Sequence, residues 1–352
     1  MKLTKFTQLE SLNLGASFLS TGGGGNPTEA LDMYRHVLKK YGGFYVKKLS
    51  DCKPNDNCIT AFGVGSNSST SNPIPAVTQG LNILKNYLGK PSIAGIIPVE
   101  IGPKSLATAA YMAAALNVPL IDADFVGGRS SPEVFLETIS LFNLKRTPAV
   151  VTNNQLQSAV LLDSPNPLFE EQFFRNFAIN SNNRAYVVGY PMKVKQLNST
   201  IVSKSVSKAY KIGQLLFKFQ LNNVLSQYQG KILFKGNIIR QSNQSNPGFS
   251  TKMIFITNNQ TTAKVWIKNE NLILWINNRL KLTCPDLIIL LDEELQPIFN
   301  KNLDEYKGSI TVIGLPAETI WKSSAGIKLF SPKNCGYNSP SKVLSINKEN
   351  LL

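Results

Sequence analysis

The chain has 352 residues, 43% of them hydrophobic, a length that suits two domains and a composition typical of globular proteins. No apolar run approaches the roughly 18 residues of a membrane span, and residues 1–10 lack a signal-peptide core, so we expect a cytoplasmic protein without a membrane partner. A net charge of +15 is typical of proteins that bind nucleic acids. The basic residues are, however, spread along the chain without a recognition motif. We therefore expect no nucleic-acid partner.

The histidine and cysteine counts exclude several kinds of site. His36 is the only histidine, so we expect no His-based zinc site and no Ser-His-Asp or Cys-His catalysis. The four cysteines, Cys52, Cys58, Cys284 and Cys335, are too few and too scattered for a disulfide framework. Any chemistry must therefore use carboxylates, Lys, Tyr, Ser, Cys or backbone groups.

The first two predicted elements are helices at residues 7–19 and 27–40, with a glycine-rich loop between them. The loop is neither a Walker A motif, since no Gly-Lys-Ser/Thr follows, nor a dinucleotide-binding turn, since a helix precedes it. Bare backbone amides before a helix suit an anion or a flat polar ligand, although a flexible turn explains the loop equally well. It contributes five candidate ligand-binding residues: Gly22, Gly23, Gly24, Gly25 and Asn26.

The next segment predicts an α/β domain. We expect strands at residues 43–49, 58–65, 93–101, 118–125 and 147–152 and helices at 76–88 and 105–116, with a polar loop at 66–75. The strand, helix and strand between residues 93 and 125 form a βαβ unit, which implies parallel strands and a right-handed crossover.

Three carboxylates are expected at the carboxyl edge of this sheet, where ligands of open α/β sheets bind. Glu100 lies near the end of one predicted strand, and Asp122 and Asp124 lie on the same side of the next because side chains alternate along a strand. Arg129 follows and could lie between two such charges. The cluster could bind a divalent metal ion or supply a general acid and base. Two solvated aspartates at a strand end are the alternative.

Glu133 has a structural interpretation. Residues 130–133, Ser-Ser-Pro-Glu, fit a capping box with Ser130 as the N-cap and Pro132 in the first turn. We therefore expect a helix to begin here, with Glu133 bonded back to its first turn.

The pattern changes after residue 167. We expect helices at 169–178 and 202–219, a strand at 184–190, and then short strands at 231–240, 249–256, 263–267, 272–276, 287–291 and 309–313, with a polar loop at 241–246. Such spacing is typical of a β-sandwich or barrel-like domain. We predict an α/β domain with a largely parallel sheet over residues 1–165, and a helix-containing, mainly β domain over 166–352.

Several blocks resemble one family, known as DUF917 or the S-methyl thiohydantoin desulfurase-like family. The similar N-terminal blocks are residues 21–27, 100–102 and 122–133, and the C-terminal ones are 268–272, 285–288 and 331–337. The likeness covers nearly the whole chain in the right order. Departures such as Ser-Ser after Arg129, and Ser331 and Cys335 where Gly and Phe are usual, leave the particular substrate open.

The resemblance implies a hydrolase for a hydantoin or thiohydantoin ring, with water adding at a ring carbon and sulfur or nitrogen departing. Such a reaction needs a base, a stabiliser of developing charge and a proton donor. On this interpretation Asp122 or Asp124 is the base with Glu100 as its partner, and Arg129 or the amides of residues 22–25 stabilise the charge.

The second domain would contribute Glu270 or Tyr337 across a cleft, with Asn269 in the same block as Glu270. Cys335 is a candidate nucleophile, although a cysteine without a histidine is more often inert. The main alternative is a non-catalytic ligand-binding or partner subunit of a hydantoinase/oxoprolinase-type assembly. A homo-oligomer or a hydantoinase-like partner would then be expected. An unrelated nucleotide-binding enzyme is a weaker option, since it rests on the glycine loop alone.

Overall fold

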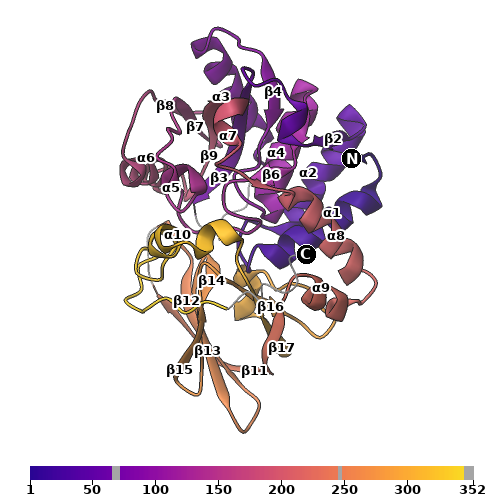
Figure 1. Cartoon of the computed structure of the whole chain (residues 1–352), viewed down its shortest axis with the longest axis vertical. Helices are drawn as coiled ribbons and strands as arrows, with labels where there is room; N and C mark the ends of the chain where they lie inside the picture. Colours follow the sequence, from indigo (N-terminus) through magenta and orange to yellow (C-terminus); the bar gives the residue numbers. More distant parts are fainter. Residues whose placement is uncertain (66–71, 245–247, 345–352) are drawn as a thin grey trace.

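The computed structural model describes residues 1–65, 72–244 and 248–344. An α/β half lies above a second, mainly β half in Figure 1. Two polar loops predicted from sequence lie partly outside the described residues. The parts left out are residues 66–71 and 245–246. No helix within the described ranges is long and apolar enough to span a bilayer.

The first sheet has eight strands in the order β1-β2-β5-β4-β3-β9-β7-β8. Its strands are β1 Lys2–Leu3, β2 Phe44–Lys47, β3 Asn57–Gly65, β4 Ile93–Ile96, β5 Leu120–Ile121, β7 Ala149–Asn153, β8 Ser158–Leu161 and β9 Arg184–Lys193. The four neighbours β2, β5, β4 and β3 are parallel, as the βαβ pattern predicts, and the others are antiparallel. The expected α/β domain with a largely parallel sheet is confirmed.

Strand β9 extends this sheet from later in the chain. It follows the domain boundary predicted at residue 165, yet it pairs with β3 on one side and β7 on the other. The residues after 183 therefore complete the first sheet before the second one begins.

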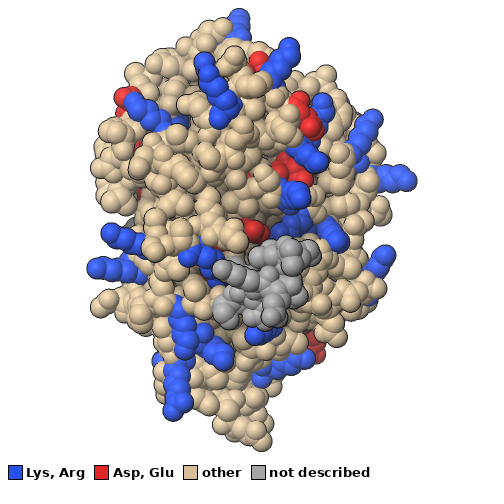
Figure 2. Space-filling view, viewed as in Figure 1, with Lys and Arg blue, Asp and Glu red and all other residues tan. Residues whose placement is uncertain are grey.

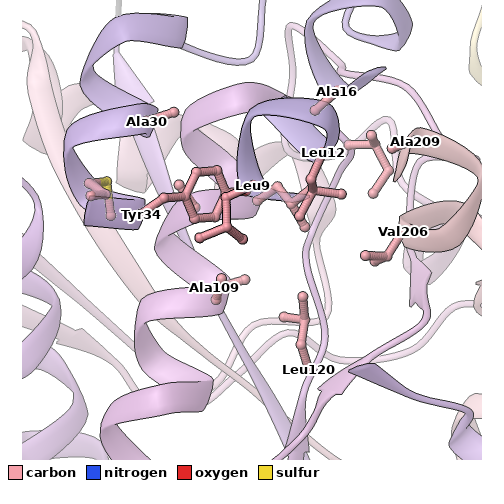
Figure 3. Packing of buried hydrophobic residues seen from close by; sticks show 14 of the residues in the cluster. Leu9, Leu12, Ala16, Ala30, Tyr34, Ala109, Leu120, Val206 and Ala209 are labelled. Carbon is pink, nitrogen blue, oxygen red and sulfur yellow. The ribbon is translucent and has the colours of Figure 1, made fainter. Parts of the chain in front are cut away.

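The helices that precede the second sheet are α1 Phe6–Leu19, α2 Pro27–Tyr41, α3 Ile74–Tyr87, α4 Pro103–Leu116, α5 Thr138–Leu141, α6 Pro167–Ile179, α7 Val194–Leu197, α8 Ser205–Leu216 and α9 Leu221–Gln227. Of these, α2, α4 and α8 pack against α1. Figure 3 shows Leu9 and Leu12 of α1 among residues of α2, α4 and α8. A Cβ at Gly15 would lie 1.7 Å from the carbonyl oxygen of Ala209, so this glycine permits α1 and α8 to touch.

The second sheet is antiparallel and has the order β15-β14-β13-β12-β11-β17-β16. Its strands are β11 Lys231–Gln244, β12 Thr251–Thr257, β13 Thr262–Lys268, β14 Glu270–Ile276, β15 Arg279–Thr283, β16 Leu287–Leu291 and β17 Ser309–Leu315, and helix α10 Ser324–Leu329 follows. β16 also contacts β14, although the two are not paired. The sheet therefore curls into a half-barrel, which confirms the mainly β prediction in its barrel-like form.

Two local predictions are wrong. The predicted strand at 118–125 breaks at Asp122, because β6 (Ala123–Asp124) leaves the first sheet and pairs with β10 (Val202–Ser203). No helix begins at residues 130–133, where the chain is irregular until α5. Glu133 there forms an ion pair with Lys268 of the second half, and this tertiary contact replaces the capping box.

The surface charges show no single dense patch on the face drawn in Figure 2. Lys and Arg side chains are scattered over this face, with Asp and Glu among them. The scatter in space matches the even spread of basic residues along the chain.

Candidate functional site

A cavity lies where the glycine loop, β3, the start of α4 and the β13–β14 turn meet. The space in it that the centre of a water molecule can reach is about 70 Å³, within a wider space of about 710 Å³ that includes open solvent. Five residues predicted from sequence line it: Gly24, Gly25, Glu100, Asn269 and Glu270. The polar side chains not assigned to the site from sequence include Lys104, Ser105, Ser131, Glu133, Glu137, Arg175, Arg184 and Tyr186.

Glu270 reaches the glycine loop from the second half of the chain. Asn269 adopts a left-handed conformation with φ 58°, which asparagine tolerates well, and so turns the chain directly into β14. The Gly24 amide then donates to Glu270 Oε1 at 3.3 Å. A Cβ at Gly23 would lie 1.9 Å from the same oxygen, so the approach requires glycine at that position.

The other carboxyl oxygen of Glu270, Oε2, has no hydrogen-bond partner among the described residues. The residue is 2% exposed, and this oxygen is buried. A buried oxygen of this kind is costly for a carboxylate, whereas a protonated carboxyl can use it as a donor. The group is therefore suited to give a hydrogen bond or a proton to a ligand in the cavity.

Glu100 also lines the cavity, from the segment between β4 and α4. Ser105 Oγ donates to its Oε1 at 2.7 Å, and the Ser131 amide donates to its Oε2 at 2.9 Å. Both oxygens accept hydrogen bonds, an arrangement that stabilises the charged form. Glu100 can therefore carry its charge more easily than Glu270 can.

Burial raises the pKa of both carboxyl groups, by different amounts. Burial raises the pKa of Glu100, and the hydrogen bonds from Ser105 and Ser131 oppose the shift. Burial and the neighbouring Glu100 raise the pKa of Glu270 well above its ordinary value, against the pull of Arg129. Two acids held in different protonation states are the usual requirement for paired general acid and base catalysis.

Basic side chains line the same cavity as Glu100 and Glu270. Lys104, in the first turn of α4, forms an ion pair with Glu29 of α2. Burial, reinforced by the charge of Arg184, lowers the pKa of Lys104 to about 8. Arg184 is the first residue of β9, so the insertion of that strand brings it to the cavity.

The rim of the cavity joins the two halves of the chain. The Lys268 ammonium lies 4.0 Å and the Arg175 guanidinium 4.1 Å from the centre of the Phe249 ring. Arg175 also binds Glu171 at 2.7 Å, and Lys268 pairs with Glu133. These contacts fix the second sheet against the first at the edge of the cavity.

Asp122 and Asp124 do not line the cavity and do not face each other. Asp124 is buried and accepts hydrogen bonds from the amides of Val126 at 3.0 Å and Gly128 at 2.9 Å. Asp122 accepts from the amide and hydroxyl of Ser207, at 2.9 and 2.7 Å, in the first turn of α8. Both carboxylates therefore hold loops and a helix end in place.

Arg129 lies behind the cavity wall. It is fully buried, donates to the carbonyl oxygens of Pro285 and Asp286, and stacks 4.7 Å from the centre of the Phe330 ring. Its charge still lowers the pKa of Glu100 and of Glu270 from that position. In this position Arg129 holds the segment at Pro285 and Asp286 and does not line the cavity.

Three residues predicted to bind a ligand, Asn26, Gly22 and Tyr337, do not line the cavity and have other contacts. Asn26 caps α2 by accepting from the Thr28 amide at 2.9 Å. Gly22 packs against Asn300, whose side chain would meet a Cβ at 2.3 Å. Tyr337 packs against Trp266 and Trp275, with ring centres 4.9 and 5.5 Å away.

Cys335 is buried beside Cys284, with the two sulfur atoms 4.0 Å apart. Burial raises the pKa of Cys335 well above its ordinary value, which leaves little thiolate at neutral pH. Its geometry is that of an inert thiol. Across residues 1–65, 72–244 and 248–344, no three His, Cys, Asp or Glu side chains are grouped so that they could hold a metal ion.

Comparisons with known proteins cover nearly the whole chain. The family model described as the S-Me-THD-like N-terminal domain matches residues 7–163, and that of the S-Me-THD-like C-terminal domain matches residues 166–344. A crystal structure of a protein from Chromobacterium violaceum has the same fold, with 20% identity, a TM-score of 0.82, and coverage of 98% of this chain and 100% of that one. No curated protein matches the chain. The two family models follow each other in order over both halves, and the protein belongs to the S-Me-THD-like family.

Proposed function

We propose that the protein is a hydrolase that adds water to a ring carbon of a hydantoin- or thiohydantoin-type cyclic ureide. The observation that carries the proposal is the pair of carboxyls, Glu100 and Glu270, that line one cavity. Both oxygens of Glu100 accept hydrogen bonds, whereas Glu270 has an oxygen without a partner among the described residues. This difference gives the cavity one base and one acid without a histidine.

The chemistry is clearest for a ring carbon that carries an S-alkyl group. The oxygen of water bonds to this carbon as its proton passes to Glu100. The carbon–sulfur bond then breaks, and the departing sulfur takes the proton of Glu270. The products are a thiol and the hydroxy-imine tautomer of the oxo ring, and exchange with solvent returns the proton from Glu100 to Glu270.

Negative charge develops on the ring nitrogens before the sulfur departs. Lys104 lines the same cavity and adjoins Ser105, the donor to Glu100, so its ammonium is one protein charge of the right sign there. A cation in a cavity shielded from water stabilises such charge more strongly than it would in bulk solvent. The pKa of about 8 for Lys104 leaves most molecules charged at pH 7.

The test is turnover of 2-methylthio-hydantoin, followed by loss of ring absorbance and by release of methanethiol. Wild-type protein should consume the compound, while Glu100→Gln and Glu270→Gln should bind it without consuming it. Glu318→Gln is the matched control, because Glu318 pairs with Lys208 at 2.7 Å away from the cavity. Binding without turnover by the wild type would instead support a ligand-binding subunit of a larger assembly.

A further inference from the structure

The outer edge of strand β8 is open in the first sheet. β8 is last in the strand order, and among the described residues it pairs with β7 alone. In the turn between the two strands, the Asn153 amide donates to the carbonyl oxygen of Gln157 at 3.0 Å. Bonded pairs recur at every second residue of an antiparallel ladder, so the backbone groups of Ser158 and Val160 point away from β7. They form a template for one more strand.

The other edge strands of the two large sheets are protected. β1 has only two residues, one of them the exposed Lys2. β15 carries the exposed Arg279 and Lys281, and its Thr283 amide donates to the carbonyl oxygen of Lys342 at 2.8 Å. β16 curls against β14. Short length, charge and cover are the usual devices that keep an edge from pairing, whereas β8 has four residues and no charge.

β8 lies in a long stretch without charge. None of residues 147–162 is charged, although the whole chain has a net charge of +15. The flanking Lys145 and Asp163 pair with each other at 2.8 Å. Two copies of so basic a chain repel each other, and this edge lets them approach without bringing like charges together. The same stretch offers no cation to an acidic partner and no anion to a basic one.

Apolar side chains accompany the open edge. Val160 and Leu162 lie on the exposed face of the strand together with Ser158, because side chains alternate along it. Helix α6 contacts β7, the neighbour of β8, and its residues Leu168 and Phe169 are 55% and 49% exposed. Figure 1 shows β8 and α6 on the same side of the α/β half. An added strand would therefore gain apolar burial as well as backbone hydrogen bonds.

We propose that β8 is a dimer contact, at which a second copy of the chain adds its own β8 antiparallel to the first. A two-fold axis at Val160 brings the same neutral strand to both sides, so each copy supplies the donors and acceptors that the other lacks. The first sheets of the two copies then form one continuous sheet. This inference does not depend on the proposed hydrolase.

The test is the mass of the full chain by sedimentation velocity at about 50 μM, well above the Kd of a micromolar dimer. The wild type should have twice the 38.7 kDa of one chain. Val160→Lys places like charges opposite each other, and Val160→Pro removes an outward amide that β7 does not use. Both variants should be monomers with near-native melting temperatures.

Ile239→Lys is the matched control for these variants. Ile239 is an exposed apolar residue on β11, in the second sheet. The same substitution at this position adds the same charge without touching the β8 edge. Ile239→Lys should therefore remain a dimer.

A cross-link locates the contact. Val160→Cys should form a covalent dimer on oxidation with diamide, because the residue faces its own copy across the axis, whereas Ile239→Cys should not. The wild type serves as the blank for Cys52, the one natural cysteine that is partly exposed. A monomeric wild type, a dimer that survives both Val160→Lys and Val160→Pro, or equal cross-linking at the two positions would overturn the inference.

Discussion

Asp124 and Glu270 are both buried acids, and they differ in what surrounds their oxygens. The amides of Val126 and Gly128, two and four residues along the chain, hold Asp124. Glu270 receives one longer bond from Gly24, 246 residues away, and keeps an oxygen without a partner. A carboxylate satisfied by its own turn is a structural group, whereas one aimed into a cavity retains capacity for a ligand.

The largest expected effect is on turnover. Glu270→Gln and Glu100→Gln should each lower kcat by about 10²- to 10⁴-fold, the usual contribution of a positioned general acid or base. Asp122→Asn should leave kcat within a few-fold, because its contact with Ser207 lies outside the cavity. Steady-state kinetics on folded variants measure both effects. A large loss in Asp122→Asn would reverse the assignment.

The next effect is on stability. Asp124→Ala leaves two buried amides without an acceptor, which costs about 1–3 kcal/mol for each such group. Urea unfolding should show the loss as a lower midpoint, while activity per folded molecule should be retained. Asp124→Ala with native stability and no activity would show that Asp124 acts in the chemistry.

A smaller stability effect should depend on pH. The folded pKa of Glu270 lies well above its unfolded value, so its protonated form favours the folded state at low pH. This contribution is lost as pH rises through the folded pKa. Glu270→Gln cannot ionise, so the melting temperature of this variant should fall less than that of the wild type between pH 5 and 9. Parallel curves would contradict the assigned shift.

The smallest expected change is in the shape of the pH–rate profile. The proposed mechanism requires Glu100 charged and Glu270 protonated, so activity should fall at low pH as Glu100 takes up a proton and at high pH as Glu270 loses one. Because burial raises the pKa of Glu100, the acidic limb should lie above the value of an ordinary glutamate. An acidic limb at or below that value would argue against Glu100 as the base.

Of the residues predicted from sequence, Gly24, Gly25, Glu100 and Glu270 are among those that line the cavity. Glu100 was predicted from its place near the end of a strand, and Glu270 only from the family resemblance. Sequence reasoning misplaced Asp122 and Asp124 because alternation along a strand says nothing about a change of partner, and β6 leaves its sheet at that point. Local patterns favoured a capping box at Glu133, while the actual partner, Lys268, is 135 residues away.

Lys104 and Arg184 were missed for different reasons. Lys104 begins a helix just after Glu100, and a lysine at the start of an alanine-rich, buried helix was a signal in the sequence that could have been used. Arg184 reaches the cavity only because β9 inserts between β3 and β7, and no local pattern specifies that pairing.

The position of β9 also limits how the polypeptide can be divided. A fragment that stops at residue 165 would lack the strand that separates β3 from β7, so each would expose an unpaired edge prone to aggregation. The complementary fragment would carry Glu270 and Arg184 without the walls that face them. We therefore expect neither fragment alone to form the cavity, since its lining residues come from both parts of the chain.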